Sequence, residues 1–211
     1  MSSWDELIYQ DWRVACGKST PFKGNDYHKI YPEGRHPLRD DKGLLEIELQ
    51  RDTFCLQFEK IRQELDSSKT LLKAGLTMRC DYMLCDDVNF LLAELTSGLS
   101  LENLENKTDK STGLTKIEKV QEQLYTTYKT LCKAKSIEQR IESCTRKLAL
   151  CSYTLSKSPH EAKRAFSRPL YADACADGKA YPSPKLDLVG IEYRRIAYIE
   201  DSPNPVAFTL S

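Results

Sequence analysis

The feature of this sequence that most constrains its fold is a long apolar stripe between residues 114 and 157. Apolar side chains recur there at steps of three and four residues, the spacing of one face of an α-helix. A continuous helix of roughly 44 residues would be about 66 Å long and could not bury its stripe against itself. The pattern therefore predicts coiled-coil packing against another helix. The stripe residues for which we predict partner contacts are Ile117, Val120, Leu124, Leu131, Ile137, Ile141, Leu148 and Leu155.

One irregularity interrupts this stripe. The steps from Leu131 to Ala134 and from Ala134 to Ile137 are both three residues. Two such steps in succession form a stammer, which overwinds a coiled coil locally. We expect the helix to continue through the stammer and to end near residues 156–158, where Ser158 and Pro159 are typical of the start of a new short helix over 159–167.

A second apolar stripe predicts another long helix over 42–75, which Gly75 ends. A short helix is expected over 86–96, with an aspartate as its N-cap. The intervening segment is long enough for the two long helices to fold back as a hairpin. Because the two helices differ in length, part of the longer stripe would stay uncovered, which favours pairing with another chain over pairing within the chain.

The two ends of the chain differ from this helical region. Residues 1–16 predict an amphipathic docking helix, and residues 17–41, rich in Gly and Pro, predict an extended linker. Both tryptophans lie in the first segment, and tryptophan is enriched in binding hot spots. This helix could dock on a partner or on its own chain, and the sequence favours neither. Its predicted contact residues are Trp4, Leu7, Ile8 and Trp12.

Residues 168–211 predict a mostly extended C-terminal arm. Five prolines punctuate it, and the β-forming residues of 186–189 and 191–199 predict one or two short strands. With a helical region over 42–167, the expected fold class is mainly α: an elongated long-helix hairpin or coiled coil with short accessory helices and this arm.

Opposite charges are balanced in the chain. Lys plus Arg and Asp plus Glu each total 31, which gives a formal net charge of zero. Attraction to nucleic acid or to an anionic membrane would need an excess of positive charge, so we expect neither partner. No apolar run reaches the roughly 18 residues of a membrane span. We expect a cytoplasmic protein, with the cytoskeleton or the nucleus as alternatives.

The cysteines and glycines do not assemble a metal or nucleotide site. The chain has eight cysteines, but no C-x-x-C pair, so burial as small apolar side chains is the preferred interpretation. Gly17-Lys18-Ser19 ends like a phosphate-binding loop, but Trp12 stands where the first glycine of that loop belongs. We therefore predict no metal ion and no cofactor.

The acidic residues are explained by helix capping. Asp40-Asp41 and Asp86-Asp87 each precede an expected helix, where carboxylates accept hydrogen bonds from free amides. An enzyme would need a cleft built around residues such as Cys80, Cys85 or His160, and the sequence gives no such arrangement. We predict no catalytic residue.

These expectations together predict a non-catalytic scaffold subunit of a multiprotein assembly. Its long helices would pack with other protein subunits as a hetero-oligomeric coiled coil, and its ends would dock neighbours. Long rods and extended arms fit cytoskeletal settings such as cilia, centrosomes and kinetochores. The alternative is a compact helical adaptor that binds a peptide or a lipid in a groove between helices.

Overall fold

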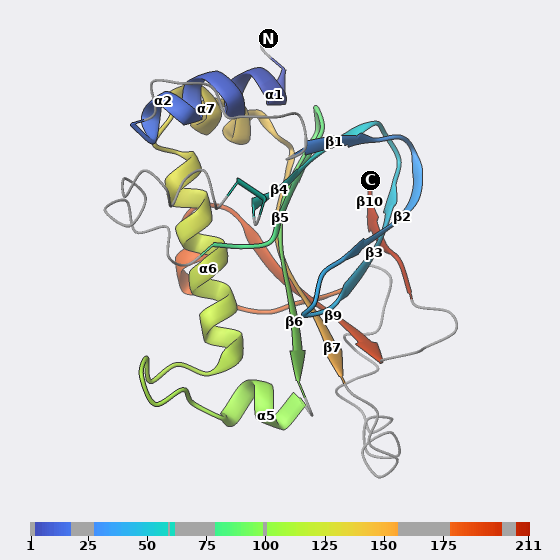
Figure 1. The fold of residues 1–211 in the computed structure, drawn as a ribbon, viewed down its shortest axis with the longest axis vertical. Helices are drawn as coiled ribbons and strands as arrows, with labels where there is room; N and C mark the ends of the chain where they lie inside the picture. The colour runs from blue at the N-terminus through green and yellow to red at the C-terminus, as the bar shows by residue number, and fades with distance from the viewer. Residues whose placement is uncertain are drawn as a thin grey trace.

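The chain folds around a seven-stranded mixed sheet with helices on one face and a smaller sheet on the other (Figure 1). The computed structural model describes residues 3–17, 28–58, 60–61, 79–98, 101–155, 178–199 and 206–211. In the large sheet, β6, β7 and β9 run parallel to one another, and the other pairs are antiparallel. In spatial order the strands are β1 (His28–Tyr31), β4 (Thr53–Gln57), β5 (Tyr82–Cys85), β6 (Asn89–Gly98), β7 (Arg146–Leu155), β9 (Glu192–Ile199) and β8 (Lys179–Ala180).

The small sheet has three strands. The hairpin of β2 (Gly34–Arg39) and β3 (Leu44–Leu49) is antiparallel, and β10 (Phe208–Leu210) pairs in parallel with β3. The two sheets thus unite residues that are far apart in the sequence.

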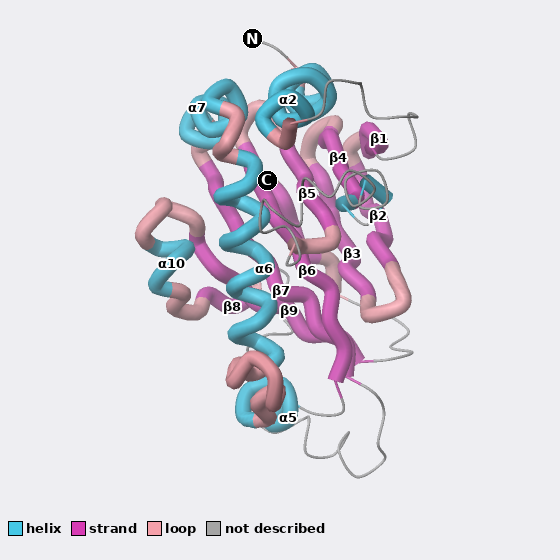
Figure 2. The backbone as a smooth tube through the Cα atoms, turned by 60° about the vertical axis from the view of Figure 1, so that its left-hand side comes forward, coloured by secondary structure: helices cyan, strands magenta, loops and turns pink. Residues whose placement is uncertain are grey.

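The helices gather on the opposite face of the large sheet (Figure 2). The long helix α6 (Lys116–Leu131) runs along the sheet, with α5 (Leu101–Asn106) at one end. At the other end α7 (Lys135–Ser143) lies beside an N-terminal helix. That helix consists of α1 (Trp4–Glu6), the π-helical η1 (Leu7–Trp12) and α2 (Arg13–Ala15), and α10 (Pro184–Asp187) completes the layer.

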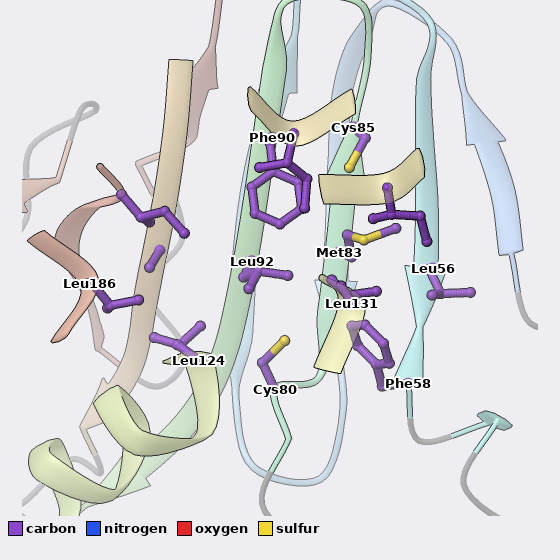
Figure 3. Packing of buried hydrophobic residues seen from close by; sticks show 14 of the residues in the cluster. Leu56, Phe58, Cys80, Met83, Cys85, Phe90, Leu92, Leu124, Leu131 and Leu186 are labelled. Atoms are coloured by element: carbon purple, nitrogen blue, oxygen red, sulfur yellow. The ribbon is translucent and has the colours of Figure 1, made fainter. Parts of the chain in front are cut away.

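Alternation along the strands builds one hydrophobic core on each face of the large sheet. On β6, Phe90 and Leu92 point toward the helices, whereas Leu91, Ala93 and Leu95 point toward the small sheet. Figure 3 shows part of the helix-side core, in which Leu124 and Leu131 of α6 lie over Met83, Leu92 and Leu56. Because both faces are covered, the central strands are buried nearly throughout.

The prediction of one helix over 114–157 is wrong. The stripe is divided among α6, α7 and β7. The first break lies at the stammer, where Ala134 has an extended backbone (φ −91°, ψ 110°), and the second at Cys144 (φ −69°, ψ 132°). The apolar positions after Cys144 fit the period of two of a strand as well as they fit a helix, and the sheet decides between them.

The predicted helices over 86–96 and 42–75 are also wrong. Residues 89–98 form the central strand β6, and residues 44–49 and 53–57 form β3 and β4. A short apolar run such as that of β6 cannot be assigned to helix or strand by periodicity alone. Residues 62–75 of the longer prediction lie outside the described residues.

The elongated coiled-coil architecture is therefore wrong as well. The expected linker 17–41 contains β1 and β2, and the expected C-terminal arm contributes β8, β9 and β10 to the two sheets. The predicted helix 159–167 lies outside the described residues. The helical stripes are covered by the chain's own sheet instead of by another chain.

Candidate functional site

Two carboxylates meet where β5 begins, beside the middle of β6. Tyr82, the first residue of β5, is paired with Ala93 of β6, so the antiparallel register places the preceding Asp81 opposite Glu94. The backbone N–H of Asp81 donates to the carbonyl of Ala93 at 3.1 Å. Asp81 is only 6% exposed and Glu94 only 3%. Ionisable side chains are rarely buried to this extent, so this pair is the strongest chemical feature of the described sheet.

Asp81 has a donor for each oxygen. Its Oδ2 accepts from the backbone N–H of Leu95 at 2.8 Å, and its Oδ1 accepts from Lys42 Nζ at 2.9 Å. The Leu95 amide belongs to the part of β6 that continues past the start of β5. The carboxylate of Asp81 thereby accepts a hydrogen bond that a backbone carbonyl of a paired strand would otherwise accept. The backbone of β6 therefore fixes the position of this carboxylate.

Glu94 is less well satisfied. Its Oε1 accepts from Gln123 Nε2 of α6 at 2.9 Å, and the same amide donates to the carbonyl of Arg79 at 3.0 Å. Its Oε2 is buried and has no donor when both carboxyl groups are ionised. Burial, followed by the charge of Asp81, raises the pKa of Glu94 to about 9, and the two side chains lie within hydrogen-bonding reach. Burial and the neighbouring carboxylate therefore favour the protonated form of Glu94.

Lys42 comes from the turn between β2 and β3, which the large sheet holds in place. Asp40 Oδ1 accepts from the backbone N–H groups of Lys42 and Gly43 at 2.8 and 2.9 Å. Tyr82 donates its hydroxyl to the carbonyl of Arg39 at 3.0 Å. A Cβ at Gly43 would lie 3.1 Å from the carbonyl oxygen of Thr96, so the turn lies tightly on β6. Burial lowers the pKa of Lys42, but the hydrogen bond and charge of Asp81 outweigh it and raise that pKa.

A second lysine approaches from the helix layer. Lys116, at the start of α6, donates to the carbonyl of Ser97 on β6. Burial and the positive charge of Lys42 lower the pKa of Lys116, whereas the charge of Glu94 raises it. Lys116 also lines a surface pocket of about 300 Å³ together with Lys107 and Lys119. Positive charge thus flanks the carboxylate pair from both layers of the fold.

The register continues this polar row across the sheet. Glu94 is paired with Cys151 of β7, and Cys151 with Arg195 of β9. Arg195 is 8% exposed, donates to Glu105 of α5 at 2.6 Å and stacks 3.9 Å from the ring centroid of Tyr181. This ion pair fastens α5 to the sheet beside the pocket of lysines.

The carboxylate pair alone does not complete a coordination sphere. No group of three or more His, Cys, Asp or Glu side chains that could hold a metal occurs among the residues with described positions. Asp81 and Glu94 supply oxygen donors of the kind that Mg²⁺ uses, and Mg²⁺ usually keeps several waters and binds only one or two carboxylates.

Comparison with protein-family models, curated proteins and solved structures gives no match. Within the described ranges, no helix is both long and apolar enough to cross a membrane. The site must therefore be interpreted from its own chemistry.

The residues predicted to bind partners lie in the core of the chain itself. The tryptophans anchor the N-terminal helix: Trp12 Nε1 donates to the carbonyl of Thr130 and Trp4 Nε1 to that of Asp86, each at 3.0 Å. The side chain of Leu155 is outside the described part, and Leu148 is buried between the sheets. The other nine predicted residues are buried with Trp12 in the helix-side core: Trp4, Leu7, Ile8, Ile117, Val120, Leu124, Leu131, Ile137 and Ile141.

The acid pairs do not cap helices. Asp40 closes the β2–β3 turn, and Asp86 Oδ1 accepts from the N–H groups of Val88 and Asn89 in the β5–β6 turn. Lys18, Ser19 and His160 lie outside the described residues. The described cysteines are free thiols, and all except the half-buried Cys132 are buried.

Sequence reasoning missed Asp81, Glu94, Lys42 and Gln123. Glu94 did carry a signal, because it is the single acid within the apolar run Phe90–Leu95. Burying an ionisable side chain inside a strand costs free energy unless the group is paired. With residues 86–96 interpreted as a helix, however, Glu94 lay outside its predicted apolar face and lost that meaning.

Proposed function

We propose that this chain is a hydrolase of phosphodiester bonds that uses a divalent cation held by Asp81 and Glu94. The observation that carries the proposal is the burial of two facing carboxyl groups, with Asp81 6% exposed and Glu94 3% exposed. Two facing carboxylates in a place shielded from water strongly attract positive charge. A proton supplies one such charge, and a divalent cation would supply more while using both carboxylates as ligands.

The surrounding charges favour a phosphate ester as the substrate. Mg²⁺ that is bound by only two carboxylates completes its coordination with water and with substrate phosphate oxygens. Lys42 donates to Asp81, and the charge of Lys116 interacts with that of Glu94, so both ammonium groups would attract an anionic substrate toward the pair. Hard oxygen ligands beside lysines suit phosphate chemistry better than redox or acyl-transfer chemistry.

The proposed reaction is simple hydrolysis. Asp81 and Glu94 would hold the cation, which would supply Lewis-acid chemistry and activate water for hydrolysis. In that hydrolysis water adds its hydroxyl to phosphorus, the P–O bond to the leaving alkoxide breaks, and the proton of the water neutralises the leaving oxygen. Lys42 and Lys116 would add positive charge near the phosphate oxygens, where negative charge accumulates in the transition state. Gln123 orients Glu94 through the hydrogen bond to Oε1.

This proposal departs from the expectation of a chain without catalysis and without a nucleic-acid partner. That expectation rested on residue spacing and on net charge, neither of which places side chains in space. The broader prediction of a scaffold subunit stays a prediction, but coiled-coil packing no longer supports it, because the described helices are packed on the sheet.

The experiment is cation binding followed by a hydrolysis assay. The purified chain is titrated with Mn²⁺, then incubated with single-stranded and double-stranded DNA and RNA in Mg²⁺ or Mn²⁺. We expect the wild-type protein to bind Mn²⁺ and to cleave one of these substrates. Asp81→Asn and Glu94→Gln should each abolish both properties while keeping the fold.

Glu46→Gln is the matched control. Glu46 is also a buried carboxylate, 7% exposed, but it lies in the small sheet and pairs with Arg35 and Arg39 at 3.4 and 3.5 Å. This variant should leave cation binding and cleavage unchanged. Absence of Mn²⁺ binding by the wild-type chain at pH 8 would overturn the proposal, and the pair would then be a proton-sharing structural contact.

A further inference from the structure

A separate pocket lies between the large sheet and the β2–β3 hairpin. Its volume is about 220 Å³, and strands β1, β2, β4 and β5 all contribute to its lining. Tyr82, in its wall, belongs to the core between the two sheets, whereas Glu94 follows the alternation of the helix-facing side chains. The pocket and the carboxyl group of Glu94 are therefore on opposite faces of the sheet.

The lining of this pocket is cationic. Lys29, Arg39 and Lys60 contribute positive charges. No Asp or Glu is among its described lining residues. Arg39 has a partner in Glu46 at 3.5 Å, but its side chain is 66% exposed, so water screens that pair.

Aromatic and hydroxyl groups give the pocket a fixed shape. The Tyr82 hydroxyl accepts from Gln57 Nε2 at 3.2 Å and donates to the carbonyl of Arg39. The ring of His28, in contrast, contacts Tyr9 and Phe54 of the helix side, with Nδ1 2.7 Å from the Tyr9 hydroxyl, so its imidazole is turned away from the pocket. The hydrogen bonds of Tyr82 thus fix the wall that the strands contribute to the pocket.

We infer that this pocket binds the phosphate group of a phosphorylated ligand. Arginine and lysine together are the usual partners of phosphate oxygens, with arginine giving paired hydrogen bonds and lysine a point charge. Drug-sized ligands occupy pockets of roughly 300–1,000 Å³, so this smaller space fits a phosphate group with little else enclosed. The remainder of the ligand would extend outward over the sheet edge.

The phosphate can come from a small molecule or from the end of a nucleic-acid strand, and the experiment separates these sources. Binding is measured by titration calorimetry in EDTA with three probes: pyrophosphate, a 5′-mononucleotide and a 5′-phosphorylated oligonucleotide. The test variant is Lys29→Gln/Lys60→Gln. The control is Lys110→Gln/Lys129→Gln, which removes the same charge at exposed positions away from the pocket.

We expect the wild-type chain to bind at least one probe and the test variant to bind it at least tenfold more weakly, with the control unchanged. Weakening for pyrophosphate or the mononucleotide identifies a small ligand, and weakening for the oligonucleotide alone identifies a strand end. Equal weakening in both double variants, or no binding of any probe, would overturn the inference. Glu94→Gln, on the helix face of the sheet, should leave this binding intact, so the outcome is independent of the proposed hydrolase.

Discussion

At the scale of single residues, Glu94 is a buried acid whose protonation changes on folding. Its pKa rises from an ordinary 4.5 to about 9, because burial and the charge of Asp81 both disfavour the carboxylate. A raised folded-state pKa means that the native state binds a proton which the unfolded chain releases. The stability that this proton provides is complete below about pH 4.5 and is lost as the pH rises through about 9.

We predict that Glu94→Gln removes this loss. Wild-type unfolding free energy should fall between about pH 5 and pH 9 by up to about 1.4 kcal/mol per pH unit more than that of Glu94→Gln. At pH 8 the variant should be the more stable protein. Urea unfolding at several pH values measures the difference, with Glu46→Gln as the control that keeps the wild-type slope. Parallel curves for wild type and Glu94→Gln would show that Glu94 is ionised in the folded chain.

Lys42 competes with any cation for Asp81. Its ammonium occupies Oδ1 at 2.9 Å, so a cation that binds this oxygen must displace it or share it. We predict that Lys42→Met strengthens Mn²⁺ binding by about tenfold, the scale of a one-unit electrostatic shift, while it weakens hydrolysis. Calorimetry and the cleavage assay test the two effects separately, with Lys110→Met as the control. Weaker Mn²⁺ binding in Lys42→Met would show that the lysine supports the cation instead of competing with it.

At the scale of elements, the spacing of apolar residues indicated which side chains are buried better than it indicated whether a segment is a helix or a strand. The N-terminal segment was expected to be an amphipathic helix, and residues 4–15 are helical with the tryptophan face buried. The stripe after Cys144 was misassigned, because Leu148, Cys151 and Leu155 fit a helix while Leu148 and Leu150 also fit one face of a strand. Parallel pairing of β7 with β6 and β9 depends on contacts distant in sequence, which a local period cannot reveal.

The N-terminal helix gives a direct test at this scale. Trp12 is 1% exposed, contacts the Phe58 ring edge-on at 6.0 Å between centroids and donates to the carbonyl of Thr130. We predict that Trp12→Ala lowers the unfolding free energy by about 3–5 kcal/mol. Val14→Ala, at a position 61% exposed, should change it by less than about 0.5 kcal/mol. Equal stability of the two variants in urea would show that the helix is not held on its own chain.

At the scale of the whole molecule, the candidate site lies where three layers meet. The carboxylates come from the large sheet, Gln123 and Lys116 from the helix layer, and Lys42 from the hairpin of the small sheet. The sequence could not predict this meeting, because it depends on how the hairpin folds over β5 and β6. The net charge of zero likewise does not describe local charge, since Lys107, Lys116 and Lys119 line one pocket despite the neutral total.

A local cluster of lysines on a neutral protein predicts a modest salt dependence of nucleic-acid binding. Each single-stranded phosphate contact adds about −0.7 to the slope of log affinity against log salt. Lys119 is paired with Asp109 at 2.7 Å, which leaves Lys107 and Lys116 as the effective contacts in their pocket. Lys107→Gln/Lys116→Gln should therefore make the slope shallower by about 1.4.

Fluorescence anisotropy with a single-stranded oligonucleotide in EDTA measures the slope, and Lys110→Gln/Lys129→Gln should leave it unchanged. An identical slope in both double variants would mean that the strand does not contact the pocket of Lys107 and Lys116, and the proposed hydrolase would then need another route for its substrate.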